Sequence, residues 1–469
     1  MTAQTATSGA PPPLTYTLAT AGSSGVWLGM GIARVAVLGI GLTASIVALS
    51  VGAPLPLAVV CLLAAVLMAG SRAAGRPLLD WAAPIGAHLA ARTSATSRWR
   101  GQVPTLPSAV AEPTRLHLPV EFGRPVIQAC PGEPAIGMII DRSTRSVTAV
   151  LDVCGVDRFP LLDATDRDAL LAGWGESLAV LADTDEALVR LQLIDRAQAR
   201  SGDVAFCPTN ELALGARDEI SALATRRASR LAAQWSFPRL GVNELATVSA
   251  RVRLLCQTLF GARLLARPLT AAQIATDLTA SLDGHSRDSD LHVAGGPLSR
   301  RIEWTHVQVD DRLHRTFAVT GWPTSPVSAA WLSPLMLAAP QTATCTVSFH
   351  LERVTPAAAA RLARSRRAKA ALDQTDRARF GMTSSAALHQ AEAAGVAMDG
   401  ELAAGYRTHR LAGLVSLAAD SVDALDDAGR MLRQAAAVCR LDLRPLHGQH
   451  DVALAACVPL CRLRTRGSG

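Results

Sequence analysis

The longest apolar run of the chain lies close to its N-terminus. No residue from Val35 to Ser71 carries a charge, and the turn-forming sequence GAPLP at residues 52–56 divides this run into two arms. Each arm holds about 17 residues, and a helix rises about 1.5 Å per residue, so each arm reaches the short end of what crosses a bilayer. The pattern predicts a two-helix transmembrane hairpin over residues 25–72.

Arginines flank this apolar run and are absent from its turn. Arg34 precedes the first arm, and five arginines between Arg72 and Arg100 follow the second. Because basic residues favour the cytoplasmic side, we expect a cell-membrane protein with both termini cytoplasmic. A signal peptide has a charged segment before one short apolar stretch, whereas the first 33 residues here carry no charged side chain. A hairpin buried inside a soluble protein is the alternative.

The hairpin is expected to join a short tail to a large cytoplasmic part. Residues 1–24 are mostly Thr, Ala, Ser, Gly and Pro, which bury little surface, so this tail is predicted to be disordered. Residues 73–115 are interpreted as a juxtamembrane segment that ends in a proline-containing linker. A polar, glycine-rich stretch at 283–299 then separates two predicted cytoplasmic α+β domains, at 116–282 and 300–464.

In the first domain, strand and helix patterns alternate along the chain. Strands are predicted at 136–140, 146–153 and 187–195, and helices at 163–181, 210–227, 242–259 and 270–282. Asp163 is a candidate N-cap, and Thr270 with Gln273 forms a capping box. Residues 229–237 fit either a helix or a strand. In the strand at 187–195 we expect Leu191 to point inward and Gln192 outward, because the pattern alternates.

The second domain shows a similar mixture of patterns. Strands are predicted at 305–309, 313–322, 343–354, 410–418 and 441–446, and helices at 384–403 and 421–439. A further helix should begin at Pro356, because Thr355 can cap it and proline suits the first helical position. The order of the later elements resembles a ferredoxin-like domain with a helical insertion. The predicted fold class is therefore α+β, with small antiparallel or mixed sheets behind the hairpin.

Bulk composition agrees with a short membrane segment and a large aqueous part. The 469 residues are 49% hydrophobic and 18% charged, which is too polar for a protein that crosses the membrane many times. Lys369 is the only lysine, so the net charge of +7 comes almost entirely from arginine. A GC-rich coding sequence explains this bias, and selection for phosphate recognition is the alternative. The nine cysteines form no CxxC motif, which argues against a zinc ribbon or a disulfide framework.

Catalytic motifs are missing from the sequence. A phosphate-binding P-loop needs a lysine directly after glycine, but Lys369 lies between two alanines. HExxH, GxSxG and GxGxxG do not occur either. His447 and His450 are the best remaining metal candidates, and a solvated loop is the alternative interpretation. We therefore predict a protein that is not an enzyme and holds no metal or cofactor.

One predicted helix carries a block of basic residues. Arg361, Arg364, Arg366 and Arg367 follow Pro356 and are our candidate partner contacts, either to acidic lipid headgroups or to an acidic protein surface. A solvated helix face is the alternative. No aromatic residues interleave with these arginines, so we expect no direct nucleic-acid contact.

Several blocks resemble a known class of protein. RSVTAVLDVCG at 145–155, DATDRDALLAGWGESLAVLA at 163–182 and FAVTGWPTSPVSAAWLSPLM at 317–336 look like actinobacterial membrane proteins encoded with conjugation-like secretion genes. The resemblance extends over most of the chain from Ile136 to Cys461. The later block is also similar to the non-catalytic N-terminal region of the type IV secretion ATPase. The hairpin resembles the double-spanning inner-membrane subunit that partners this ATPase.

The resemblance implies a non-catalytic, membrane-anchored docking component of a type IV secretion-like conjugation apparatus. Its implied partners are the membrane, a P-loop secretion ATPase and other subunits of the channel. An EccE-type membrane subunit of a type VII secretion system is the alternative, because it too has two N-terminal spans and a domain without catalytic motifs. A membrane-bound metal-dependent enzyme that uses His447 and His450 is a more distant alternative.

Overall fold

The structure is a computed structural model that covers most of the chain. It describes residues 32–52, 54–73, 76–93, 96–101, 114–115, 117–155, 162–199, 225–283, 296–323, 325–337, 343–379, 393, 395–396, 398–400, 402–403 and 407–463. The predicted tail, and most of the helices predicted at 210–227 and 384–403, lie outside these residues.

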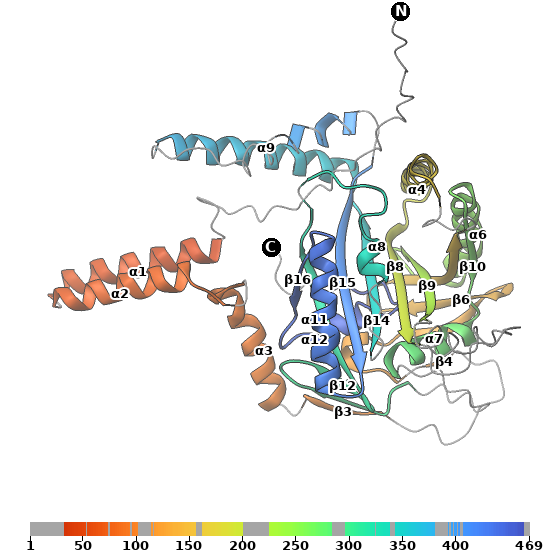
Figure 1. Cartoon of the computed structure of the whole chain (residues 1–469), viewed down its shortest axis with the longest axis horizontal. Helices are drawn as coiled ribbons and strands as arrows, with labels where there is room; N and C mark the ends of the chain where they lie inside the picture. The colour runs from red at the N-terminus through yellow and green to blue at the C-terminus, as the bar shows by residue number, and fades with distance from the viewer. Residues whose placement is uncertain are drawn as a thin grey trace, which may run out of the picture.

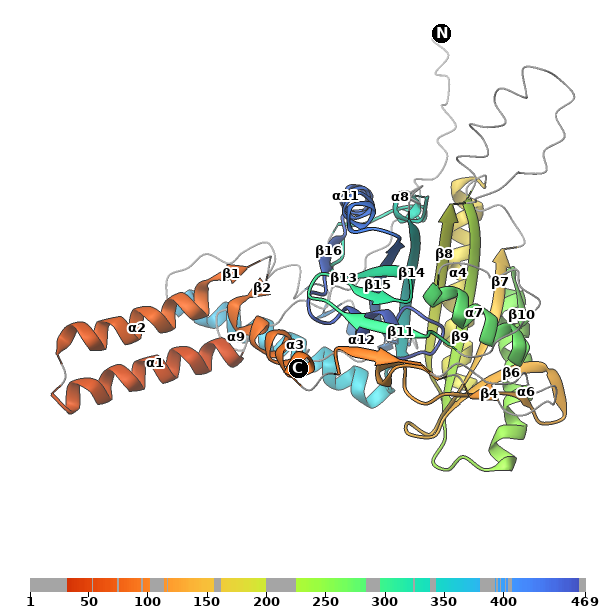
Figure 2. The ribbon, with the colours of Figure 1, turned by 90° about the horizontal axis from the view of Figure 1, so that it is seen from below.

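The N-terminal apolar run forms two helices that lie side by side. Helix α1 spans Ile32–Ser50 and helix α2 spans Leu55–Gly70, and the pair projects away from the rest of the molecule (Figures 1 and 2). Small residues allow the helices to approach closely, since a Cβ added at Gly41 would overlap the side chain of Ala65. The Ser45 hydroxyl also donates to the Ala58 carbonyl at 2.8 Å. The predicted helices and the turn between them are therefore present.

The prediction that this hairpin crosses a membrane is wrong. Across the described residues, no helix combines the length and the apolar character that a membrane span requires. Helix α2 has 16 residues, which rise about 24 Å against a bilayer core of roughly 30 Å.

A short N-terminal segment connects the hairpin to the body of the molecule. It contains the two-residue strands β1 (Arg72–Ala73) and β2 (Arg76–Pro77), the 3-10 helix η1 (Leu78–Trp81), helix α3 (Ala82–Thr93) and strand β3 (Arg98–Arg100). Strand β3 pairs with β11 (Ser299–Ile302). The connecting segment is thereby attached to one edge of the main sheet.

The body is built on one large antiparallel sheet of 14 strands. The strand order is β3-β11-β12-β13-β15-β14-β8-β9-β7-β6-β5-β4, while β10 pairs with β7 and β16 with β13. The first half contains β4 (Thr114–Arg115), η2 (Val120–Phe122), β5 (Val126–Cys130), β6 (Glu133–Asp141), β7 (Ser146–Gly155), α4 (Ala164–Thr184), β8 (Leu188–Ala199), β9 (Thr225–Ser236), α6 (Val242–Gly261), β10 (Leu264–Pro268) and α7 (Ala271–Asp283). The second half contains β12 (Val307–Val309), β13 (Arg312–Gly321), α8 (Ser333–Leu337), β14 (Thr344–Arg353), α9 (Pro356–Arg379), β15 (His409–Ala419), α11 (Val422–Val438), β16 (Asp442–Pro445) and α12 (His450–Ala455).

The two halves repeat the same topology. In the first half β9 lies between β7 and β8, and β10 pairs with β7; in the second half β15 lies between β13 and β14, and β16 pairs with β13. Strands β8 and β14 occupy equivalent places and pair antiparallel with each other, from Arg190 opposite Glu352 to Ala197 opposite Cys345. We call this ladder the seam. An antiparallel pairing of equivalent strands relates the halves by an approximate two-fold axis.

The sequence supports this internal repeat after the strands are matched. Helices α6 and α11 are each followed by an arginine in the left-handed region, Arg263 with φ 58° and Arg440 with φ 56°. The next six residues read LLARPL at 264–269 and LDLRPL at 441–446. Buried residues recur at the same spacing in the two helices: Val248, Val252, Leu255 and Leu259 in α6, and Leu425, Gly429, Leu432 and Ala436 in α11.

Helices cover both faces of the sheet. On one face, α4 and α6 pack over the first half in a core around Trp235, and α11 and α8 pack over the second half around Phe317. On the other face, α7 and α12 share a core with the final segment that ends near Cys461. The sheet therefore has no face directed wholly to solvent, in contrast to many antiparallel sheets.

Local signals in the sequence predict most elements correctly. Asp163 caps α4 by accepting a hydrogen bond from the Asp166 N–H at 2.8 Å. Thr270 and Gln273 form the predicted capping box of α7. The ambiguous segment at 229–237 belongs to strand β9.

Two expectations about the sheets are wrong. Gln192 does not face outward but is fully buried, because both faces of its strand are covered. The later elements also do not form a separate ferredoxin-like sheet, since β14 pairs directly with β15 on one side and with β8 of the first half on the other. Whether residues 116–282 and 300–464 fold as independent domains stays a prediction.

Candidate docking surfaces

The hairpin presents a continuous apolar surface. Fifteen large apolar residues from Ile40 to Met68 are exposed, with Val51 at 80% and Leu55 at 66%. The buried positions of α2 are Ala58, Ala65 and Ala69, which lie within a narrow sector at about 100° per residue, so the rest of its circumference is exposed. Monomeric proteins seldom expose contiguous apolar patches beyond a few hundred Å². This surface, which we call the hairpin surface, therefore needs a cover that the described chain does not supply.

Polar groups within the hairpin are satisfied locally. The hydroxyl of Thr43 donates to the Gly39 and Ile40 carbonyls, and that of Ser50 donates to the Val47 carbonyl at 2.8 Å. These hydroxyls are thus hydrogen-bonded before any partner arrives. The hairpin surface offers apolar contact rather than a polar binding site.

The predicted basic block lies on α9. Arg361 and Arg364 are exposed, and the Arg364 Nε donates to the Ala360 carbonyl of its own helix at 3.3 Å. Arg367 forms an ion pair with Asp399. The side chain of Arg366 lies outside the described part of the structure. In both Figure 1 and Figure 2, α9 extends from the body toward the same side as the hairpin.

Arginines in the sheet body differ from those at the start of α9. Most have a carboxylate partner within the chain, and the ion-paired arginines of the body are Arg190, Arg196, Arg227, Arg230, Arg251, Arg253, Arg300, Arg301, Arg312, Arg315, Arg407, Arg410, Arg430 and Arg462. No ion pair to Arg361 or Arg364 occurs among the described residues. The outer face of α9 therefore carries positive charge that the described chain does not neutralise.

An aromatic cluster holds the base of the hairpin against the body. The ring centroids of Trp81, Trp304 and His447 lie 5.9 to 6.1 Å from one another, and His88 of α3 meets Trp304 edge-on at 5.3 Å. Gly448 permits this packing, because it has φ +70° and a Cβ there would lie 2.6 Å from the Trp304 ring. Such aromatic pairs contribute about 0.5–1.5 kcal/mol each beyond area burial. The cluster fixes the direction in which the connecting segment leaves the sheet.

The two candidate metal ligands belong to this cluster and its surroundings. His447 and His450 meet edge-on at 5.9 Å. The Nδ1 of His450 accepts the Thr316 N–H at 3.1 Å, so this nitrogen is occupied. Burial, followed by the neighbouring His447, lowers the pKa of His450 well below 6.5. Within the described ranges, no group of three or more His, Cys, Asp or Glu side chains is arranged to hold a metal.

A buried polar network crosses the seam, and sequence reasoning missed it. The Gln192 Nε2 lies 2.9 Å from the Ala456 carbonyl, 3.0 Å from the Val458 carbonyl and 3.0 Å from the Ser348 hydroxyl. Its Oε1 accepts the Cys461 N–H at 2.8 Å. His350 Nε2 also lies 2.8 Å from the Ala456 carbonyl. This network fixes the C-terminal segment across the seam.

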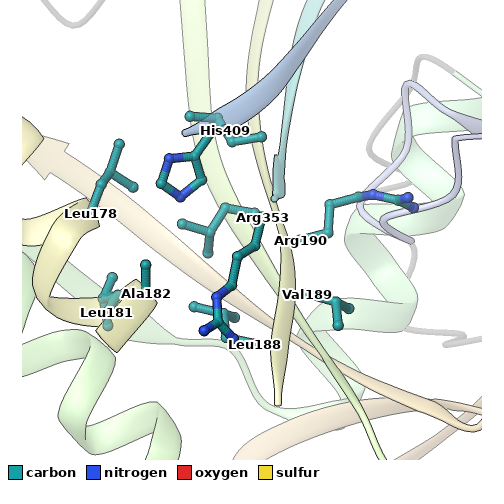
Figure 3. Close-up of a pocket in the computed structure, with 10 residues that line it drawn as sticks. Leu178, Leu181, Ala182, Leu188, Val189, Arg190, Arg353 and His409 are labelled. Carbon is teal, nitrogen blue, oxygen red and sulfur yellow. The ribbon is translucent and has the colours of Figure 1, made fainter. Parts of the chain in front are cut away.

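Two cavities of the described structure are small. Figure 3 shows one at the end of the seam, where Arg353 and His409 lie beside the apolar Leu181 of α4 and Leu188 of β8, but its volume is only about 10 Å³. Arg353 is already engaged, since its Nη1 donates to the Glu186 carbonyl at 3.0 Å. A second cavity, beside Arg263 between α4 and the end of α6, has about 170 Å³. Ligand pockets usually hold about 300–1,000 Å³, so neither cavity favours a small-molecule substrate.

Comparison with protein-family models and with curated proteins finds no match to this sequence.

Proposed function

We propose that the chain is a non-catalytic docking component of a secretion apparatus. The hairpin surface carries this proposal, because it is apolar on every side except the contact between α1 and α2. A helix that is apolar all round normally lies in the interior of a larger structure. A partner that covers it would remove from water the apolar area that the chain leaves exposed.

The type IV secretion-like apparatus is the form that the sequence blocks favour. Residues 317–336, which include GWPTSP, resemble the non-catalytic region of the type IV secretion ATPase. An EccE-type subunit of a type VII system is the second candidate, because this class also has a domain without catalytic motifs. The proposed partner is in each case a P-loop secretion ATPase together with other channel subunits. The location at the cell membrane, with both termini cytoplasmic, stays a prediction that fractionation and reporter fusions test.

Capture of the ATPase tests the proposed function. The tagged full-length chain is purified from detergent extracts of its own host, and the ATPase is identified by peptide mass spectrometry. We expect capture by the wild type, and the class of ATPase distinguishes a type IV-like from a type VII-like apparatus.

Matched variants show whether the hairpin surface is responsible. Leu63→Ser and Val66→Ser together place two hydroxyls on the exposed side of α2, whereas Val438→Ser alters a residue that is 70% exposed on α11. The hairpin variant should lose capture and the α11 variant should keep it. Absence of any secretion ATPase from the wild-type sample would refute the proposed function.

A further inference from the structure

The orientation of α9 distinguishes among its arginines. Ala359 and Ala363 are fully buried and mark the inner side of the helix. At about 100° per residue, Arg361 and Arg364 lie about 140–200° from Ala359, which places them on the outer side. Arg367 lies nearer the inner side, where it pairs with Asp399. The structure thus selects Arg361 and Arg364, which we call the outer arginine pair, from the four arginines that the sequence suggested.

Charge at this end of α9 is unbalanced. Residues 356–370 include five basic residues and no acidic one. Elsewhere in the body, arginines are commonly paired with carboxylates. An external anionic group would relieve the mutual repulsion of these arginines.

The residues around the outer arginine pair are small. Ala357, Ser365 and Ala368 are exposed on the same side of the helix. Small side chains allow another helix to approach closely, whereas helices that bind lipid surfaces present bulky apolar residues. Nucleic-acid surfaces usually add aromatic stacking, and this face has none. The face therefore fits a helix better than a bilayer or a nucleic acid.

We propose that the outer arginine pair docks an acidic helix of a protein partner. Arg361 and Arg364 are three residues apart, and carboxylates at positions three or four apart on a facing helix match this spacing. A planar guanidinium can bind a carboxylate through two parallel hydrogen bonds, which a lysine cannot do. This inference deepens the proposed docking function by naming the chemistry of one partner contact.

A synthetic acidic helix tests the proposal without the secretion apparatus. The probe is a fluorescein-labelled, alanine-rich peptide with glutamates three and four residues apart, titrated with the full-length chain and followed by fluorescence anisotropy. We expect saturable binding that weakens as salt is added. The double variant R361E/R364E should weaken binding about tenfold or more, because it replaces two attractive contacts by repulsion.

Two control variants separate a specific contact from general charge. R433E reverses an exposed arginine on α11 and should leave peptide affinity within about twofold of the wild type. R361K/R364K keeps the charge but loses the planar fork, so its affinity should lie between those of the wild type and R361E/R364E. Circular dichroism and thermal melting of each variant confirm that the fold is intact.

Several results would overturn the proposal. The first is that the wild-type chain does not bind the peptide, and the second is that R433E loses as much peptide affinity as R361E/R364E. The third is that phosphatidylserine vesicles or duplex DNA bind through these arginines while the peptide does not bind. Failure of this arginine contact and failure of the proposed docking function give different results. ATPase capture that is equal for the wild type and R361E/R364E would preserve the docking function and reject this contact. Peptide binding without ATPase capture would preserve this contact and reject the docking function.

Discussion

Replacement of Gln192 by leucine is the sharpest test of how the seam is stabilised. Gln192 is fully buried in β8, and its side chain reaches the C-terminal segment through the Ala456 and Val458 carbonyls and the Cys461 N–H. An amide nitrogen has only two N–H groups, so at most two of its three neighbouring acceptors are served at one time. Leucine is one heavy atom smaller, branches at Cγ rather than at Cδ, and can form none of these hydrogen bonds.

The expected loss of stability follows from which groups remain without a partner. The Ala456 carbonyl keeps the imidazole of His350 as a neighbour at 2.8 Å, and the Val458 carbonyl keeps the Leu460 N–H at 2.7 Å, so the Cys461 N–H is the group that loses its hydrogen-bond partner. Each buried polar group left unsatisfied costs about 1–3 kcal/mol. Burial of the leucine side chain returns roughly 1–2 kcal/mol. Gln192 also loses its own hydrogen bonds, at about 0.5–1.5 kcal/mol each, so we expect Gln192→Leu to lower the free energy of unfolding by about 1–3 kcal/mol.

The free energies of unfolding of the wild type and the variant are measured by urea denaturation of the full-length chain. Tryptophan fluorescence reports the unfolding, since Trp235 is fully buried near the seam. Gln257→Leu is the matched control, because Gln257 is exposed on α6 and its replacement should change stability by no more than about 0.5 kcal/mol. Equal unfolding midpoints for Gln192→Leu, Gln257→Leu and the wild type would refute the view that this network stabilises the seam.

Three further predictions concern stability and activity. Burial lowers the pKa of His314 and of His350 from 6.5 to about 4, so the folded chain binds fewer protons than the unfolded chain. The stability that these neutral histidines contribute should be fully present above pH 6.5 and should fall progressively toward pH 4. A thermal midpoint that stays constant over this window would contradict the assignment. Phe317→Ala removes a fully buried phenyl group and should cost about 3–5 kcal/mol in urea unfolding, whereas the exposed Met431→Ala should cost less than about 1 kcal/mol. Because Lys369 is the only lysine and does not follow a glycine, the purified chain should show no ATPase activity of its own, and turnover that persists through repeated purification would exclude this interpretation.

Local signals predict the elements better than their assembly. Caps such as Asp163 and Thr270 depend on residues three positions apart, so the sequence displays them directly. The outward direction assigned to Gln192 failed for a different reason. Strict alternation predicts a solvent-facing side only when one face of the sheet is open, and here α12 and the final segment cover that face from more than 250 residues away.

The docking surfaces were predictable in part. The apolar arms identify the hairpin surface, but no described helix is both long enough and apolar enough for the membrane span that the sequence suggested. The basic block was visible as a cluster around Arg364, yet the sequence could not separate Arg361 from Arg367. That separation depends on Asp399, which lies 32 residues beyond Arg367 and pairs with it from another part of the chain.

The internal repeat explains where the basic surface of α9 occurs. Each half has a connection between equivalent strands, at residues 200–224 between β8 and β9 and at residues 354–408 between β14 and β15. Since β8 and β14 pair antiparallel, these connections begin at opposite ends of the seam. The second connection contains α9, which extends toward the side of the hairpin, whereas the first begins at the other end. The hairpin lies outside the repeat but extends to the same side as α9, so a single large partner on this side would contact both the apolar and the basic surface.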